Sequence, residues 1–80
     1  MDISNYRILP SKHFVLGWMR KWDYNEEDLK NLLEAAYKIE KVGKYKYEAY
    51  FRAKGKSRKL IFIKDDEMKQ ILIITGAEGR

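Results

Sequence analysis

Residues 44 to 63, KYKYEAYFRAKGKSRKLIFI, begin with a regular alternation of apolar and mostly basic side chains. Successive side chains of a β-strand point to opposite faces of the sheet, so this period of two predicts a strand with one apolar and one basic face. The apolar positions are Tyr45, Tyr47, Ala49, Phe51 and Ala53, and the opposite positions are Lys44, Lys46, Glu48, Tyr50, Arg52 and Lys54. We expect Gly55 to Ser57 to turn the chain and Arg58 to Ile63 to form the second strand of a hairpin.

The triplet Gly55-Lys56-Ser57 also ends the phosphate-binding loop of many nucleotide-binding proteins, but the rest of that pattern is missing. The loop needs a second glycine five residues before Gly55, where this chain has Tyr50. It must also open a helix whose backbone amides hold the phosphate, whereas a strand-like run follows Ser57. The sequence therefore favours a basic hairpin over a nucleotide-binding loop.

Two helices are expected between residues 11 and 38. Ser11 is placed to cap the first, because its hydroxyl can accept a hydrogen bond from a backbone amide of the first turn. Bulky apolar residues then recur at helical spacing, at Phe14, Val15, Trp18, Met19 and Trp22. Asn25 is placed to cap the second helix, whose apolar stripe is Leu29, Leu32, Leu33 and Ala36.

Further strands are expected on either side of these elements. Gln70 to Thr75 reads as a third strand, and Tyr6 to Leu9 as a candidate edge strand. The pattern predicts one α+β domain, residues 1 to 80, with two helices packed on one face of a three- to four-stranded antiparallel sheet. Its expected core is Phe14, Trp18, Leu29, Leu32, Leu33, Tyr45, Tyr47 and Phe51.

The composition limits the chemistry of the chain. With no cysteine and one histidine among 80 residues, neither a disulfide framework nor a zinc site is available, and we expect no metal and no cofactor. No apolar run approaches the length that crosses a membrane. The sequence therefore predicts a soluble, cytoplasmic protein without a membrane partner.

Positive charge is concentrated in one segment. Residues 41 to 59 carry eight basic side chains and one acidic one, a net charge of +7, whereas the whole chain carries +5. Such a patch favours RNA or another polyanion as the partner, although lysines on an exposed strand also protect a sheet edge from aggregation. The residues expected to bind nucleic acid are Lys44, Lys46, Tyr50, Arg52, Lys54, Lys56, Arg58 and Lys59.

Four short pieces of the chain read as motifs: Ser11-Lys12-His13, Tyr24 to Leu29, Arg58 to Phe62 and Ile73-Ile74-Thr75. They resemble motifs of the RelE/ParE-like toxin superfamily, in particular of a poorly characterised bacterial and archaeal branch with a histidine on its first helix. The arginine that the family has one turn after the histidine is absent, because Gly17 and Trp18 stand there.

The resemblance implies metal-independent cleavage of RNA, in which the ribose 2′-hydroxyl attacks the neighbouring phosphate. It assigns catalysis here to His13, as acid or base, and to Arg52 and Arg58, as cations that stabilise the phosphorane charge. A lone histidine near a helix start is also commonly a surface or capping residue. The alternative function is therefore a non-enzymatic adaptor that binds nucleic acid or protein on the same scaffold.

The last two expected strands are apolar on both faces. Leu60 and Phe62 alternate with Ile61 and Ile63, and the same holds for the run from Ile71 to Ile74. One set must point away from the helices, which would leave an apolar patch in water. The sequence predicts that a second copy of the chain in a homodimer covers this face, or else, as the resemblance implies, an antitoxin segment. The alternative is that the N-terminal segment and the tail cover it.

Overall fold

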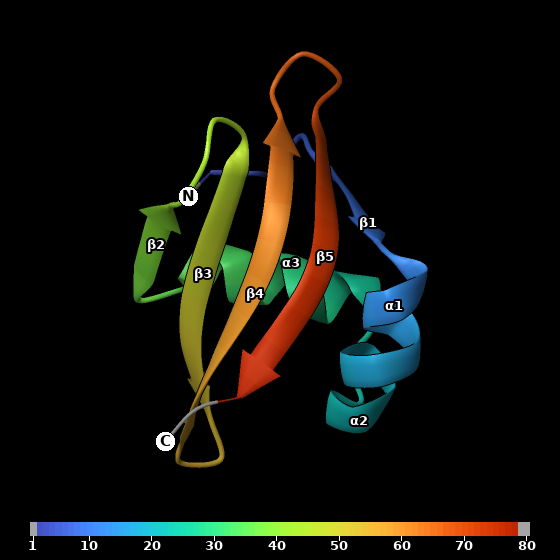
Figure 1. The fold of residues 1–80 in the computed structure, drawn as a ribbon, viewed down its shortest axis with the longest axis vertical. Coiled ribbons are helices and arrows are strands. Elements are labelled where there is room, and N and C mark those ends of the chain that lie inside the picture. The colour runs from blue at the N-terminus through green and yellow to red at the C-terminus, as the bar shows by residue number, and fades with distance from the viewer. Residues whose placement is uncertain (1, 79–80) are drawn as a thin grey trace.

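A computed structural model describes residues 2–78 as a mixed sheet with short helical segments (Figure 1). The strands are β1 (Arg7–Pro10), β2 (Lys38–Lys41), β3 (Lys46–Ala53), β4 (Lys56–Asp65) and β5 (Gln70–Glu78). Between β1 and β2 lie α1 (Lys12–Phe14), the π-helical turn η1 (Val15–Met19), α2 (Arg20–Trp22) and α3 (Glu26–Ala35).

The sheet has five strands in the order β1-β5-β4-β3-β2. Strands β2 to β5 form an antiparallel meander, whereas β1 pairs in parallel with β5. The expectation of two helices on one face of a three- to four-stranded antiparallel sheet is therefore wrong. The chain leaves β1 through the helices, runs through the whole meander and returns beside β1 in the same direction, which makes that pair parallel.

Strand β2 is the element that the sequence does not reveal. Its four residues, KIEK, include one apolar side chain, Ile39, so they show no alternation. The strand forms because Tyr37 and the residues after it pair with β3: the Tyr37 backbone N–H donates to the Tyr50 carbonyl at 3.0 Å, and the ladder continues to Lys41 opposite Tyr47. Tertiary pairing, not local propensity, specifies this edge strand.

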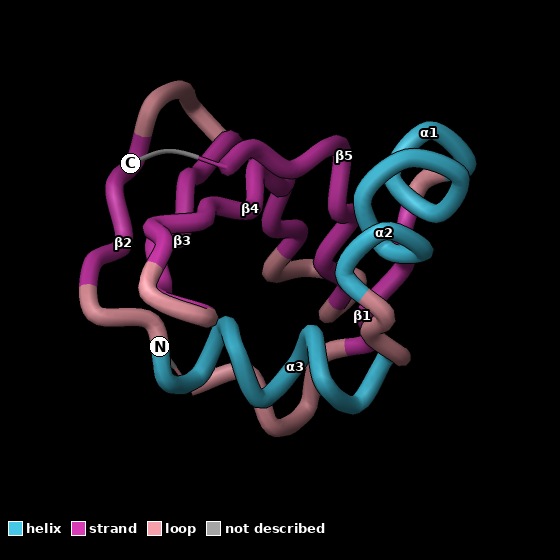
Figure 2. Tube along the Cα trace, turned by 90° about the horizontal axis from the view of Figure 1, so that it is seen from below, coloured by secondary structure: helices cyan, strands magenta, loops and turns pink. Residues whose placement is uncertain are grey.

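The helices do not form one layer over the sheet (Figure 2). Helix α3 runs across one face, called the inner face from here on, and buries Leu29 and Leu33 against it. The segment from α1 to α2 lies instead beside β1 and β5 at one edge of the sheet (Figures 1 and 2). Within residues 2–78, the opposite face of the sheet, the outer face, carries no helix (Figure 2).

Most of the expected core is confirmed. Phe14, Leu29, Leu33 and Phe51 are buried, and Trp18, Leu32 and Tyr47 are half-buried against them. Tyr45 is an exception, because it precedes β3 and leaves 58% of its surface exposed. The remaining buried apolar residues are Ile3, Ile8, Trp22, Ala49, Leu60, Phe62, Ile71 and Ile73.

Both helix entrances are confirmed. The Ser11 hydroxyl accepts a hydrogen bond from the Phe14 N–H at 3.1 Å. Asn25 and Asp28 form a capping box, in which each side chain accepts a hydrogen bond from the other residue's backbone N–H, at 2.8 and 3.0 Å. These caps satisfy amides that have no partner within the helix, and they place Trp22 and Leu29 over the sheet.

The tip of the β3–β4 hairpin lies one residue earlier than expected. Lys54 and Gly55 form a two-residue turn with φ values of 53° and 77°, and β4 begins at Lys56. Positive φ at both positions matches the twist of a two-residue hairpin and favours glycine at the second. Ser57 lies within a strand and opens no helix, so the exclusion of a nucleotide-binding loop is confirmed.

Strand β5 contains a β-bulge at Ile74. Thr75 pairs with Ile61 and Ile73 pairs with Phe62, so the residue between them has no partner on β4. One extra residue shifts the alternation of side chains along the rest of the strand. Gly76 and Glu78 therefore fall on the inner face, opposite Leu60 and Arg58.

The bulge is also where the first helical segment is attached. The Ser11 hydroxyl donates to the Ile74 carbonyl oxygen at 2.8 Å, and the Ser11 N–H donates to the Ile73 carbonyl oxygen at 2.9 Å. The indole of Trp22 then lies directly on Gly76, where a Cβ atom would stand 2.8 Å from Trp22 Cη2. A glycine is needed here because any side chain would occupy the space of the ring.

The outer face is apolar over β4, β5 and β1, as the double-faced strands predicted. Ile63 and Leu72 are neighbours there with 37% and 39% of their surfaces exposed, while Leu60 and Phe62 are fully buried on the inner face. The N-terminal segment does not cover this region, because β1 extends the sheet at its edge. No other part of residues 2–78 covers it, and the homodimer or partner stays a prediction.

Substituting Gly76 on β5 and Gly17 in η1 should have opposite effects on stability. Gly76→Ala forces Trp22 and Phe14 to move, and we expect the free energy of unfolding to fall by about 1–3 kcal/mol. The Cβ atom that Gly17→Ala adds has no neighbour within 4 Å. This substitution should raise the free energy of unfolding by up to about 1 kcal/mol, because alanine favours a helix more than glycine does. Urea denaturation measures both, and an unchanged Gly76→Ala protein would contradict the packing of Trp22 on β5.

Candidate nucleic-acid interface

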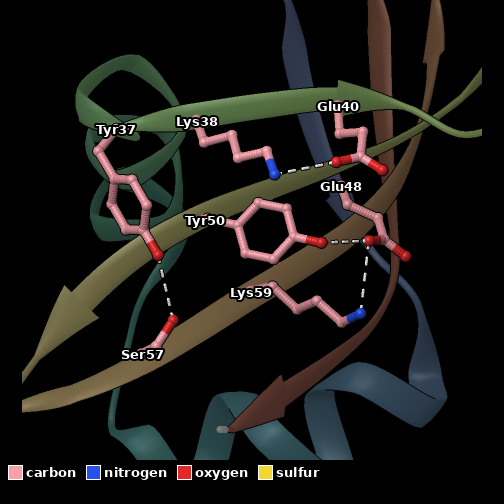
Figure 3. A network of polar contacts seen from close by, with 7 residues as sticks. All are labelled: Tyr37, Lys38, Glu40, Glu48, Tyr50, Ser57 and Lys59. Carbon is pink, nitrogen blue, oxygen red and sulfur yellow. Dashed lines mark hydrogen bonds and ion pairs between the residues drawn. The ribbon is translucent and has the colours of Figure 1, made fainter. Parts of the chain in front are cut away.

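The outer face over β2, β3 and β4 carries aromatic and charged side chains in cross-strand rows (Figure 3). Tyr50 lies between Lys38 on β2 and Lys59 on β4, each directly opposite it in the ladder. The next row toward the end of the hairpin joins Arg52 to Ser57. The row on the other side of Tyr50 joins Glu40 to Glu48. We call this region the polar outer face; its members are Tyr37, Lys38, Glu40, Lys46, Glu48, Tyr50, Arg52, Ser57 and Lys59.

Tyr50 is at the centre of this surface. Its hydroxyl donates to Glu48 Oε1 at 2.6 Å, and the nitrogens of Lys38 and Lys59 stand 5.3 and 5.8 Å from its ring centroid. The hydrogen bond to Glu48 raises the pKa of Tyr50 to about 12, and it also lowers the pKa of Glu48. The phenol is therefore neutral and the carboxylate charged at neutral pH, and the ring is held in one orientation.

Tyr37 provides a second ring on the same surface. It is 55% exposed, its centroid is 6.4 Å from that of Tyr50, and its hydroxyl lies 3.2 Å from Ser57 Oγ. The guanidinium carbon of Arg52 stands 5.6 Å from the Tyr37 centroid. No sequence pattern singles out Tyr37, because it directly follows the apolar stripe of α3 and is expected at the end of that helix.

The cations of the polar outer face fall into two groups. Lys38 pairs with Glu40 at 3.2 Å, and Lys59 pairs with Glu48 at 3.4 Å. Arg52, Lys46 and the turn residue Lys54 are exposed and form no ion pair with any carboxylate within residues 2–78. The polar outer face and the adjoining turn residue Lys54 together carry five cations and two carboxylates, a net charge of +3. The unpaired cations are available to an anionic ligand.

Arg58 lies on the other side of the sheet. It is 8% exposed, its Nε donates to Glu78 Oε2 at 2.8 Å, and its Nη1 donates to the Tyr24 hydroxyl oxygen at 3.0 Å. The guanidinium carbon also stands 4.8 Å from the Trp22 ring centroid. Glu78 takes a second cation, Lys56, at 3.5 Å. Two of the basic residues expected at the binding site are therefore engaged by one carboxylate on the inner side.

The residues assigned to catalysis are not brought together. His13 is exposed on α1, beside β1 and β5, and β4 separates that edge from Arg52 on β3. Arg52 and Arg58 project from opposite faces of the sheet, because Arg52 pairs with Ser57, the residue beside Arg58, in the ladder. No single phosphate can contact both guanidinium groups in this arrangement. Lys44, the remaining predicted binding residue, is exposed in the β2–β3 turn.

A hollow of about 290 Å³ opens beside Tyr50. It extends from Tyr50 across β4 to Ala77 on β5. Its other lining residues are Ser57, Arg58, Lys59 and Glu78. A hydroxyl and an ammonium group thus border an aromatic ring, which suits a flat polar ligand. Two other hollows, of about 530 and 430 Å³, lie near Tyr6 and α3 and near the β4–β5 turn, and neither is lined by a residue of the polar outer face.

Within residues 2–78, no three His, Cys, Asp or Glu side chains are grouped so that they could hold a metal ion. In the same range, no helix has both the length and the apolar character needed to cross a membrane.

Comparison of the chain with protein-family models, with curated proteins and with solved structures gave no match. The resemblance to RelE/ParE-like toxins therefore rests on the short sequence motifs alone.

Exchanging the two arginines of the hairpin for methionine should separate their roles. Arg58→Met removes the hydrogen bonds to Glu78 and Tyr24 and leaves Glu78 with Lys56 alone, so we expect the free energy of unfolding to fall by roughly 1–3 kcal/mol. Arg52→Met removes an exposed side chain and should change it by no more than about 0.5 kcal/mol. Urea denaturation of both variants is the measurement, and equal losses would contradict a structural role for Arg58.

The pairing of Glu78 should also make stability depend on pH. Its hydrogen bond to Arg58 is the main reason that the pKa of Glu78 lies below its ordinary value of 4.5. A carboxyl group with a lowered pKa in the folded state stabilises the fold above its unfolded pKa, and this contribution is lost as the pH falls through the lowered value. Glu78→Gln should therefore be less stable than the wild type at pH 7 and approach it in acid. If the difference in the free energy of unfolding between the wild type and Glu78→Gln stays the same as the pH is lowered, the ion pair between Glu78 and Arg58 is contradicted.

Proposed function

We propose that this protein binds RNA through the polar outer face and the adjoining tip of the β3–β4 hairpin. The observation that carries the proposal is the position of Arg52, Lys46 and Lys54 on β3 and its turn. All three are exposed without a carboxylate partner in residues 2–78, and Arg52 stands 5.6 Å from the Tyr37 ring centroid. Phosphate groups are the ligands that such cations favour, and rings beside them suit bases. RNA is the nucleic acid that the sequence resemblance implies.

Binding without cleavage is the form of this function that the geometry supports. The attacking hydroxyl and the phosphate of a cleavage site need an acid or base and cations at one point in space. His13, Arg52 and Arg58 lie on three elements and on both sides of the sheet. Endoribonuclease activity stays a prediction of the resemblance, and the non-enzymatic adaptor is the alternative that we favour.

Removing charge from the hairpin should weaken binding and its dependence on salt. Each phosphate contact releases counterions, so that log affinity falls with log salt by about 0.7 per contact for a single strand. Arg52→Gln with Lys54→Gln should therefore weaken binding of a fluorescein-labelled 12-nucleotide RNA and reduce the salt slope by about 1.4. Fluorescence polarisation at several salt concentrations measures both quantities.

The matched control loses the same two charges elsewhere. Lys12 and Arg20 are exposed on the helical segment at the β1–β5 edge, so Lys12→Gln with Arg20→Gln changes the net charge equally without touching the polar outer face. We expect this control to keep the wild-type salt slope. Equal slopes for the hairpin and control variants, or tighter binding of a DNA strand of the same sequence, would contradict the proposal.

A further inference from the structure

The tyrosines of the polar outer face indicate whether single-stranded or duplex RNA fits this surface better. Duplex RNA offers phosphates and 2′-hydroxyl groups to a protein, and its bases are already stacked on one another. Unpaired bases can instead stack on aromatic side chains, and each such contact contributes to affinity whatever the base. An exposed ring within a cationic surface is therefore of use to a single strand and of little use to a duplex.

Resting on the RNA-binding function above, we propose that the ligand is single-stranded and that its bases stack on Tyr37 and Tyr50. More than half of the Tyr37 surface is exposed, although the ring is anchored at its hydroxyl by Ser57. Tyr50 is anchored in the same way by Glu48. Because both rings are held before the ligand arrives, stacking orders few side-chain torsions, and the entropic cost of binding is small.

The groups around the rings are placed for the rest of each nucleotide. Arg52 stands over Tyr37 and has no carboxylate partner within residues 2–78, so its guanidinium can contact a phosphate beside a stacked base. Lys54 follows at the hairpin tip. On the other side, the hollow between Tyr50 and Ala77 is bordered by Ser57 and Lys59, which carry hydrogen-bond donors for the edge of a base.

The hydrogen bonds already present do not block this arrangement (Figure 3). A stacking base takes the place of a cation at the ring, because Lys38 and Lys59 lie over Tyr50 and Arg52 lies over Tyr37. The hydrogen bonds of Tyr37 and Tyr50 use only the hydroxyl at the tip of each ring. Lys38 and Lys59 form ion pairs with Glu40 and Glu48. The cations that can contact phosphates are therefore Arg52, Lys46 and Lys54. Stacking and phosphate contact are thus assigned to different residues, and variants can separate them.

Polarisation with two probes tests the inference: a labelled 12-nucleotide RNA, and the same RNA paired with its complement. We expect the single strand to bind more tightly than the duplex. Tyr37→Leu should weaken single-strand binding by at least about fivefold, since a stacked base contributes about 1 kcal/mol or more, and it should leave the salt slope unchanged. Tyr50→Leu should act similarly, whereas Tyr50→Phe keeps the ring and should bind more tightly than Tyr50→Leu.

Tyr45 is the matched control. It is a tyrosine of similar exposure, 58%, beside a lysine, but it precedes β3 in the β2–β3 turn, outside the proposed site. Tyr45→Leu should bind the single strand like the wild type. Wild-type protein labelled with ¹³C on its tyrosine rings gives a second readout that needs no variant, because stacking should shift the signals of Tyr37 and Tyr50 and leave that of Tyr45 in place.

The outcomes separate this inference from the function on which it rests. If neither RNA binds, RNA binding itself is wrong. If the duplex binds as tightly as the single strand, and Tyr37→Leu binds as tightly as the wild type while the hairpin charge variant is weakened, RNA binding stands and base stacking is overturned. Unshifted signals of Tyr37 and Tyr50 at saturating RNA would also overturn it.

Discussion

The β-bulge at Ile74 is the feature on which both faces of the molecule depend. Without the extra residue, the alternation along β5 would turn Gly76 and Glu78 outward. With it, Gly76 faces inward and receives the Trp22 indole, and Glu78 faces Arg58. The Ser11 hydroxyl donates to the carbonyl oxygen of the bulge residue, Ile74. One short stretch of β5 therefore contacts Ser11 at the start of the first helical segment, Trp22 at its end and Arg58 on the hairpin.

A consequence of this geometry is that the basic segment is divided between two roles. Arg58 and Lys56 point inward, where Glu78 pairs with both of them and Trp22 covers the guanidinium. Strand alternation sends Arg52 and Lys59 outward. Net charge along a sequence therefore overstates the charge of any one surface of a sheet. The part that faces solvent without a partner is smaller, and it is the part that a polyanion would contact.

Local patterns predicted the helix caps, the hairpin, the outward position of Tyr50 and the two apolar faces of β4, because each depends on side-chain period or on one capping residue. The sequence did not predict β2, the parallel pairing of β1 or the bulge, since these depend on pairing between distant segments. At the candidate site, it named Arg52 and Tyr50 but missed Tyr37. The alternation of side chains along β4 did not show that Arg58 is buried and paired with Glu78. Glu78 lies opposite Arg58 only because of the bulge, and the bulge is on β5.

The carboxylates of the polar outer face have a role that net charge conceals. Glu40 and Glu48 lie directly opposite one another on β2 and β3, an arrangement that would be repulsive on its own. Each is paired with a lysine of the neighbouring row, and Glu48 also accepts the Tyr50 hydroxyl. These pairs relieve repulsion both between the acids and among the lysines, in a chain whose net charge is +5. The carboxylates thus allow the strands to pair and hold the central ring in place, while the cations nearest the hairpin tip are left without partners.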